Sequence, residues 1–104
     1  MIGKRRDKDA KWDKNFRIVM FDVPEEKKKI RDMLRRKLES IGFMQMQKSV
    51  FVYPFDCKED IDSICYFLGS GKYLKYLVVK ITEGEEELIE EFLQKNILTL
   101  DDLK

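Results

Sequence analysis

Apolar and polar residues alternate along this chain in blocks that predict a mixed fold. The segment FRIVMF, residues 16–21, is apolar except for Arg17 and is followed at once by Asp22 and Pro24. A short apolar run of this kind is typical of a strand buried on both faces, so we expect a central strand here. Apolar side chains then recur at spacings of three and four up to Ile41, which predicts an amphipathic helix that begins near Pro24 and ends at Gly42.

The second half repeats this order of strand and helix. Residues 43–53 predict one long bent strand or two short ones, and a short helix follows Asp56. The run YLKYLVVKI at residues 73–81 predicts a strand, and the segment from Glu85 predicts a last helix. This order favours an α+β fold, a ferredoxin-like βαββαβ sandwich with a C-terminal helix. Helices on one face would leave an apolar sheet face uncovered, so we expect a homodimer.

Three parts of the chain are expected from the change in pattern. Residues 1–15 are polar and without periodicity, so they are interpreted as a basic flexible arm with Trp12 as its anchor. Residues 16–82 form the ferredoxin-like domain, and residues 83–104 form an acidic C-terminal helix and tail. Only about 15 residues precede the first strand, so we expect no winged-helix domain ahead of it.

Composition excludes several kinds of chemistry. The chain has no histidine, which removes Ser-His-Asp and Cys-His catalysis and histidine-ligated metals. Cys57 and Cys65 lie eight positions apart, too few ligands for a zinc site, and both are interpreted as reduced thiols, with Cys65 buried. The chain contains neither a run of about 20 apolar residues nor a signal peptide, so we expect a cytoplasmic protein without a membrane segment.

Charge is distributed unevenly along the chain. Residues 1–50 carry 15 basic and 8 acidic side chains, whereas residues 51–104 carry 6 and 12. Basic residues on one side of the first predicted helix often form only a solvated helix face. Here the excess of basic over acidic residues extends beyond that helix, which favours binding to phosphate backbones without base readout. The residues expected to bind nucleic acid are Arg5, Arg6, Lys27, Lys28, Lys29, Arg31, Arg35, Arg36 and Lys48.

Asp22 has two interpretations, and the sequence leaves both open. With Glu25 three positions later it has the spacing of a capping box, so it is expected as a helix N-cap. Its carboxylate also suits Mg²⁺ or Mn²⁺, and two copies across a dimer axis would make a small catalytic metal site. Asp56 and Glu59 predict a second capping box.

Neighbouring polar and aromatic positions are weaker candidates. Gln47 and Ser49 are placed either beside Asp22 at a dimer axis or simply on the solvent side of a strand. Three aromatic residues are placed either in the core or against nucleic-acid bases, and these are Phe51, Tyr53 and Phe55.

The segment FDVPEEKKKIRDMLRRKLESIGF, followed by QMQKSVFVYPFDC, resembles the CRISPR-associated Cas-two family and, equally, the related central domain of the repressor PaaX. The resemblance covers about residues 16–81 and implies a ferredoxin-like protomer and a homodimer joined through its sheets. It places a divalent metal, Mg²⁺ or Mn²⁺, at Asp22 on the dimer axis. It also implies binding of duplex DNA together with a Cas-one integrase that performs the chemistry.

The resemblance leaves three functions open. The first is a CRISPR adaptation protein, a dimeric scaffold that holds prespacer duplex DNA with the Cas-one integrase, for which the acidic last helix is a plausible dock. The second is a metal-dependent endonuclease that acts on RNA or DNA through Asp22. The third is a PaaX-like transcriptional regulator module, because the ending VYPFDC resembles the repressor's version more than that of many spacer-acquisition proteins, which place a Glu after the SVF segment. We predict the first function and keep the other two as alternatives.

Overall fold

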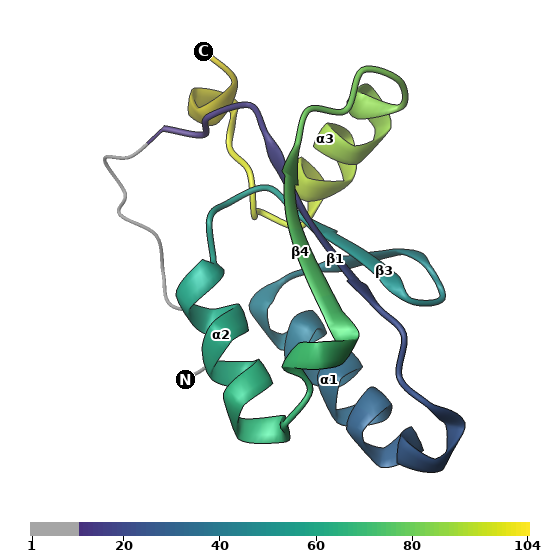
Figure 1. Ribbon diagram of the computed structural model, residues 1–104. Coiled ribbons are helices and arrows are strands. Elements are labelled where there is room, and N and C mark those ends of the chain that lie inside the picture. The colour runs from purple at the N-terminus through teal and green to yellow at the C-terminus, as the bar shows by residue number, and fades with distance from the viewer. Residues whose placement is uncertain (1–10) are drawn as a thin grey trace.

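The computed structural model describes residues 11–104 and shows a mixed α+β domain (Figure 1). Within these residues the chain forms a βαββαβ unit and continues into a third helix. The elements in chain order are β1 (Phe16–Phe21), a 3-10 turn (Glu25–Lys27), α1 (Lys28–Ile41), β2 (Met44–Gln47), β3 (Val50–Tyr53), α2 (Lys58–Leu68), a 3-10 turn (Gly71–Tyr73), β4 (Leu74–Val79), α3 (Glu85–Gln94) and a last 3-10 turn (Leu100–Leu103).

The four strands form one antiparallel sheet in the order β2-β3-β1-β4, so the predicted central position of residues 16–21 is confirmed. Ile18 lies opposite Val52 on one side and Leu77 on the other. Residues 43–53 form two strands rather than one, and the pairing shifts between Gln45 and Gln47. This sheet and its helices match the ferredoxin-like α+β class expected from the sequence.

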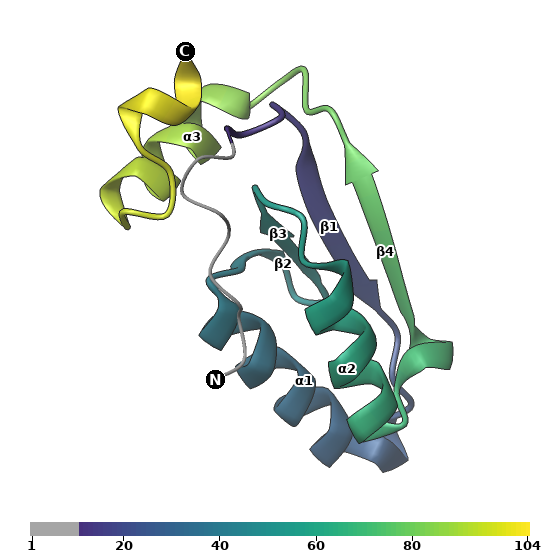
Figure 2. The same cartoon turned by 90° about the vertical axis from the view of Figure 1, so that its left-hand side faces the viewer.

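Helices α1 and α2 lie together on one face of the sheet (Figure 2). Because side chains of a strand alternate between faces, Val19 and Phe21 point to these helices. They form a cluster with Leu34 and Leu38 of α1 and Phe51 of β3, and all five are buried. The apolar stripe predicted for the first helix therefore faces this core.

Helix α3 lies on the opposite side of β4 from α2 (Figure 1). Its Phe92 packs with Phe16 and Val52 in a second buried cluster on the outer face of the sheet. The cover is incomplete, since Met20 and Leu77, farther along the same face, are 42% and 37% exposed. One half of the outer sheet face is thus covered within the chain, and the other half keeps the exposed apolar residues that the sequence led us to expect.

The two predicted capping boxes are wrong. The residue before the first 3-10 turn is Pro24, α1 begins only at Lys28, and neither start has a side-chain cap. The fixed φ of Pro24 starts this turn directly, so Asp22 lies outside it. At α2, Asp56 does accept a hydrogen bond from the Lys58 amide at 3.2 Å, but the N-cap is Cys57 and has no side-chain cap.

The end of α1 is as predicted. Gly42 has φ of 122°, and its amide donates to the carbonyl oxygens of Leu38 and Glu39. A Cβ at this position would lie 3.0 Å from the Tyr53 ring. Glycine therefore serves both the backbone conformation and the close approach of the strand to the helix.

Residues 11–15, which the sequence assigned to the arm, pack on the domain. Trp12 is 4% exposed and contacts the Phe16 ring edge-on at 5.2 Å, which confirms its role as an anchor. Lys14 Nζ donates a hydrogen bond to the Asp102 carbonyl oxygen at 2.9 Å and lies over the Trp12 ring. The entry segment and the last turn of the chain are thereby joined.

Within residues 11–104, no helix has the length and apolar character needed to cross a bilayer.

Candidate nucleic-acid interface

The solvent side of α1 and the turn before it forms a cationic surface. Residues 25–41 contain seven basic and four acidic side chains. Five of the predicted cations are exposed: Lys27, Lys28, Lys29 and Arg36 here, and Lys48 at the β2–β3 turn. Flexible exposed lysines and arginines at the surface suit contact with phosphates rather than with base edges.

Arg31 and Arg35 differ from the other cations because they are half-buried. They lie four residues apart on α1, and the Nε atom of each is covered without a hydrogen-bond partner. Arg31 also contacts Glu25, with 3.3 Å between Nη1 and Oε2. Their guanidinium stems therefore pack along the side of the helix, and only their tips extend the cationic surface.

Asp22 lies at the end of the central strand, between two loops. Its amide donates to the Tyr73 carbonyl oxygen at 2.9 Å, and the preceding Phe21 amide donates to that of Ser49 at 3.1 Å. The Asp22 side chain is exposed. Among residues 11–104 the structure has no cluster of three or more acidic or cysteine side chains able to hold a metal ion. Within one protomer, the accessible Asp22 carboxylate is therefore not part of such a cluster.

The remaining predicted site residues are separated by the fold. Gln47 is exposed and Ser49 is half-buried near the β2–β3 turn. Phe51 and Phe55 are buried, which confirms the core alternative for both rings over stacking on bases. The Phe51 ring stacks on the Phe21 ring with 5.7 Å between their centroids, and the Tyr53 ring stacks on the Phe43 ring with 5.0 Å between theirs. Arg5 and Arg6 lie outside the described residues.

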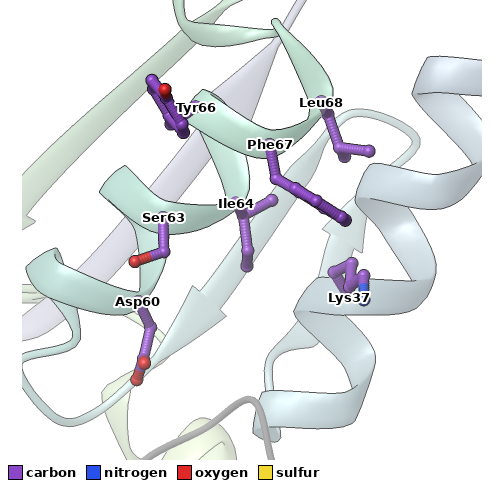
Figure 3. A pocket seen from close by; sticks show the side chains of 7 residues that line it. All are labelled: Lys37, Asp60, Ser63, Ile64, Tyr66, Phe67 and Leu68. Carbon is purple, nitrogen blue, oxygen red and sulfur yellow. The ribbon is translucent and has the colours of Figure 1, made fainter.

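Two exposed aromatic residues were missed by the sequence reasoning. Tyr66 and Phe67 of α2 are 91% and 78% exposed. Phe67 lines a groove between α1 and α2, opposite Lys37 (Figure 3). Their position off the apolar stripe formed by Ile61 and Ile64 was a usable signal, because stripe residues are the ones that enter the core.

The buried Arg17 organises the charges beside the N-terminus of α2. Its guanidinium donates to both carboxylate oxygens of Asp13, at 2.9 and 2.6 Å, and to the Pro54 carbonyl oxygen at 2.8 Å. The hydrogen bonds from Arg17 lower the pKa of Asp13, although partial burial acts in the opposite direction. This contact fixes the entry segment against the end of β3.

The two thiols are free, and Cys57 is the more buried of the pair, contrary to the expectation for Cys65. Burial raises the pKa of Cys57 to about 12. Its amide donates a hydrogen bond to the Tyr76 hydroxyl at 3.2 Å, and that hydroxyl donates to the Asp56 carboxylate at 3.3 Å. Burial also raises the pKa of Tyr76. Cys57 is therefore a poor nucleophile and serves in packing.

Comparison with known protein families shows which family the domain belongs to. The family described as PaaX protein central Cas2-like domain matches residues 9–89, which is most of the chain and includes β1 to β4. The chain belongs to this family. Neither the curated proteins nor the solved structures contain a match. The family name supports the Cas2-like relationship expected from the sequence, and it does not by itself separate a CRISPR protein from a PaaX-related one.

Proposed function

We propose that this chain is a non-catalytic homodimeric module that binds the backbone of duplex DNA. The observation that carries the proposal is the separation of two surfaces. Exposed Met20 and Leu77 lie on the outer face of the sheet, whereas the cationic surface lies on α1, in the helical layer on the other face. A dimer joined through the sheets leaves the basic helices of both protomers accessible to phosphates.

The dimer is tested by neighbouring residues of β4 that face opposite sides of the sheet. Leu77→Asp places a charge on the outer face, and Val78→Asp is the control because Val78 is 54% exposed on the other face. We expect sedimentation velocity to show a dimer for the unmodified chain and for Val78→Asp, and a monomer for Leu77→Asp. A monomeric unmodified chain at micromolar concentration would contradict the proposal.

DNA binding is tested with a duplex of about 30 base pairs over a range of salt concentrations. The double variant Lys28→Ala/Arg36→Ala removes two exposed charges from α1, and Lys80→Ala/Lys95→Ala removes two exposed charges elsewhere. Because each position occurs twice in the dimer, the first variant removes four charges, and we expect it to reduce the slope of log K against log salt by about 3–4, whereas the second should leave the slope unchanged. Equal effects of the two variants on the slope would show that binding depends only on the net charge of the protein. Absence of duplex binding at low salt would refute the proposed function.

Two biological settings use such a module. In the first, the dimer is a CRISPR adaptation scaffold that holds a prespacer duplex between Cas-one integrase subunits, and the exposed glutamates of α3 are a dock for a basic partner. In the second, it is part of a PaaX-like transcriptional regulator, a setting that the family name supports equally. Tighter duplex binding in the presence of integrase supports the first setting, and preference for one operator sequence supports the second.

Nuclease activity through Asp22 is the enzymatic alternative, with Mg²⁺ or Mn²⁺ held between two copies of the residue. The exposed carboxylate at the end of β1 is accessible to such an ion, and carboxylate oxygen suits either metal. The variant Asp22→Asn separates the functions. If the domain is a scaffold, the variant binds duplex as the unmodified chain does, and neither protein degrades RNA or DNA in Mg²⁺ or Mn²⁺. Cleavage that Asp22→Asn abolishes would establish the nuclease instead.

A further inference from the structure

The exposed aromatic pair on α2 has no role in the core. Tyr66 and Phe67 lie in the last turn of α2 and are 91% and 78% exposed, whereas the buried residues of this helix are Ile61 and Ile64. Large aromatic side chains contribute to stability mainly through buried area, so two neighbouring rings in solvent stabilise the fold very little. Such a pair is informative because adjacent exposed aromatics commonly mark a binding surface.

Phe67 forms one side of a groove between the two helices. The groove has a volume of about 580 Å³ and is lined by Lys37 of α1 and by six residues of α2, among them Ser63, Ile64 and Leu68. In Figure 3 the Phe67 ring points toward Lys37, while the Tyr66 ring extends on the other side of α2. Both residues are among those that line the groove. The volume falls in the range of pockets for small organic groups such as a nucleotide.

Charge around the groove indicates which ligand fits. The α1 side carries Lys37 in the groove and the exposed Lys29 and Arg36 on the same helix. The acidic residues of α2 lie in its first half, from Glu59 to Asp62. One of them, Asp60, lines the groove at the end away from the aromatic pair, so the negative charge is confined to that end (Figure 3). A polyanion is therefore favoured along α1 and disfavoured along the start of α2.

We propose that this groove binds an unpaired nucleotide of a nucleic-acid strand whose phosphates follow α1. The base stacks on the Phe67 ring, and the Lys37 ammonium group contacts the adjacent phosphate. Any base offers a flat face, so this contact has no sequence preference. The inference rests on the proposed function, and it extends that function from duplex DNA to ends, flaps or single strands with exposed bases.

The experiment compares two fluorescently labelled probes, a duplex of about 30 base pairs and a single strand of the same length, by anisotropy with the full chain. The variant Phe67→Ala removes the stacking ring, and Phe67→Trp keeps one. Leu100→Ala is the matched control because Leu100 is an apolar residue that is 72% exposed in another part of the molecule. Circular dichroism and sedimentation velocity of each variant accompany the titrations.

We expect Phe67→Ala to weaken single-strand binding by about tenfold and duplex binding by less than about twofold, since each stacked base contributes substantially. Phe67→Trp should retain single-strand affinity, and Leu100→Ala should change neither. If Phe67→Ala binds both probes as the unmodified chain does, the inference fails and duplex binding stands. If it changes self-association but not probe affinity, the groove is a protein contact and the inference fails. If neither probe binds at low salt, both proposals fail.

Discussion

Replacing Arg17 by methionine tests how much the buried guanidinium contributes to stability. Arg17 is 6% exposed, and its hydrogen bond to the Pro54 carbonyl oxygen is buried. An acceptor left buried without a donor costs about 1–3 kcal/mol. The ion pair adds less, about 0.2–1 kcal/mol, because the Asp13 side chain is 46% exposed and solvent screens it.

Methionine keeps most of the apolar stem of Arg17 and requires no desolvation of a charge, which offsets part of this loss. We therefore expect Arg17→Met to lower the free energy of unfolding by about 2 kcal/mol, which corresponds to roughly 8–16 °C in Tm for a domain of this size. Urea unfolding followed by circular dichroism measures the change. A loss below about 0.5 kcal/mol would refute the assignment of the Pro54 contact as the main contribution.

Two further variants separate the contributions. Asp13→Asn removes only the ion pair and should cost less than about 1 kcal/mol at pH 7. Lys58→Met breaks an exposed ion pair with Asp62 at 2.8 Å and should leave the free energy of unfolding nearly unchanged, because solvent screens both charges. If Asp13→Asn destabilises as much as Arg17→Met, the ion pair rather than the carbonyl contact dominates.

The Asp13 contribution also has a defined pH dependence. The pKa of Asp13 is lowered in the folded state from its ordinary value of 3.8. A carboxyl group of this kind stabilises the fold above its unfolded pKa and loses that contribution as the pH falls through its folded pKa. The difference in stability between the unmodified chain and Asp13→Asn should thus be constant from pH 7 to about pH 5 and disappear in more acidic solution. A difference that grows with acid would contradict the assigned direction.

Other predictions concern the first helix end and the thiols. Gly42→Ala should destabilise the fold by about 1–3 kcal/mol in urea unfolding, because φ is 122° and the new Cβ would meet the Tyr53 ring at 3.0 Å; a neutral result would show that the loop relaxes freely. Cys65 should be alkylated by iodoacetamide at pH 8 well before Cys57, as mass spectrometry of peptides would show, since burial raises the pKa of Cys57 to about 12 and Cys65 is only half-buried. Faster reaction at Cys57 would contradict this order.

The sequence determined the order and type of the main elements. Periodicity of apolar residues is a local property, and it placed the central strand, the amphipathic first helix and its end at Gly42. The excess of Lys and Arg on that helix was also visible, because residues off the apolar stripe of a helix face solvent. The family relationship likewise followed from local motifs that the family match supports.

Only the tertiary structure decided the role of individual polar and aromatic residues. The spacing of Asp22 and Glu25 is compatible with a cap, but the chain turns at Pro24 and leaves Asp22 exposed beside two loops. Phe51 enters the core although Phe67 does not. Burial of an aromatic ring depends on which surfaces pack together across the whole chain.

The same reason explains the buried Arg17. Its position in an apolar strand gave no indication of the partners that complete its hydrogen bonds. These are Asp13, four residues earlier, and the Pro54 carbonyl group, 37 residues later. Whether a charge in a strand is paired depends on contacts between segments distant in sequence, and a local pattern contains no information about them. Local periodicity thus determined the elements, whereas long-range packing determined which side chains remained available for binding.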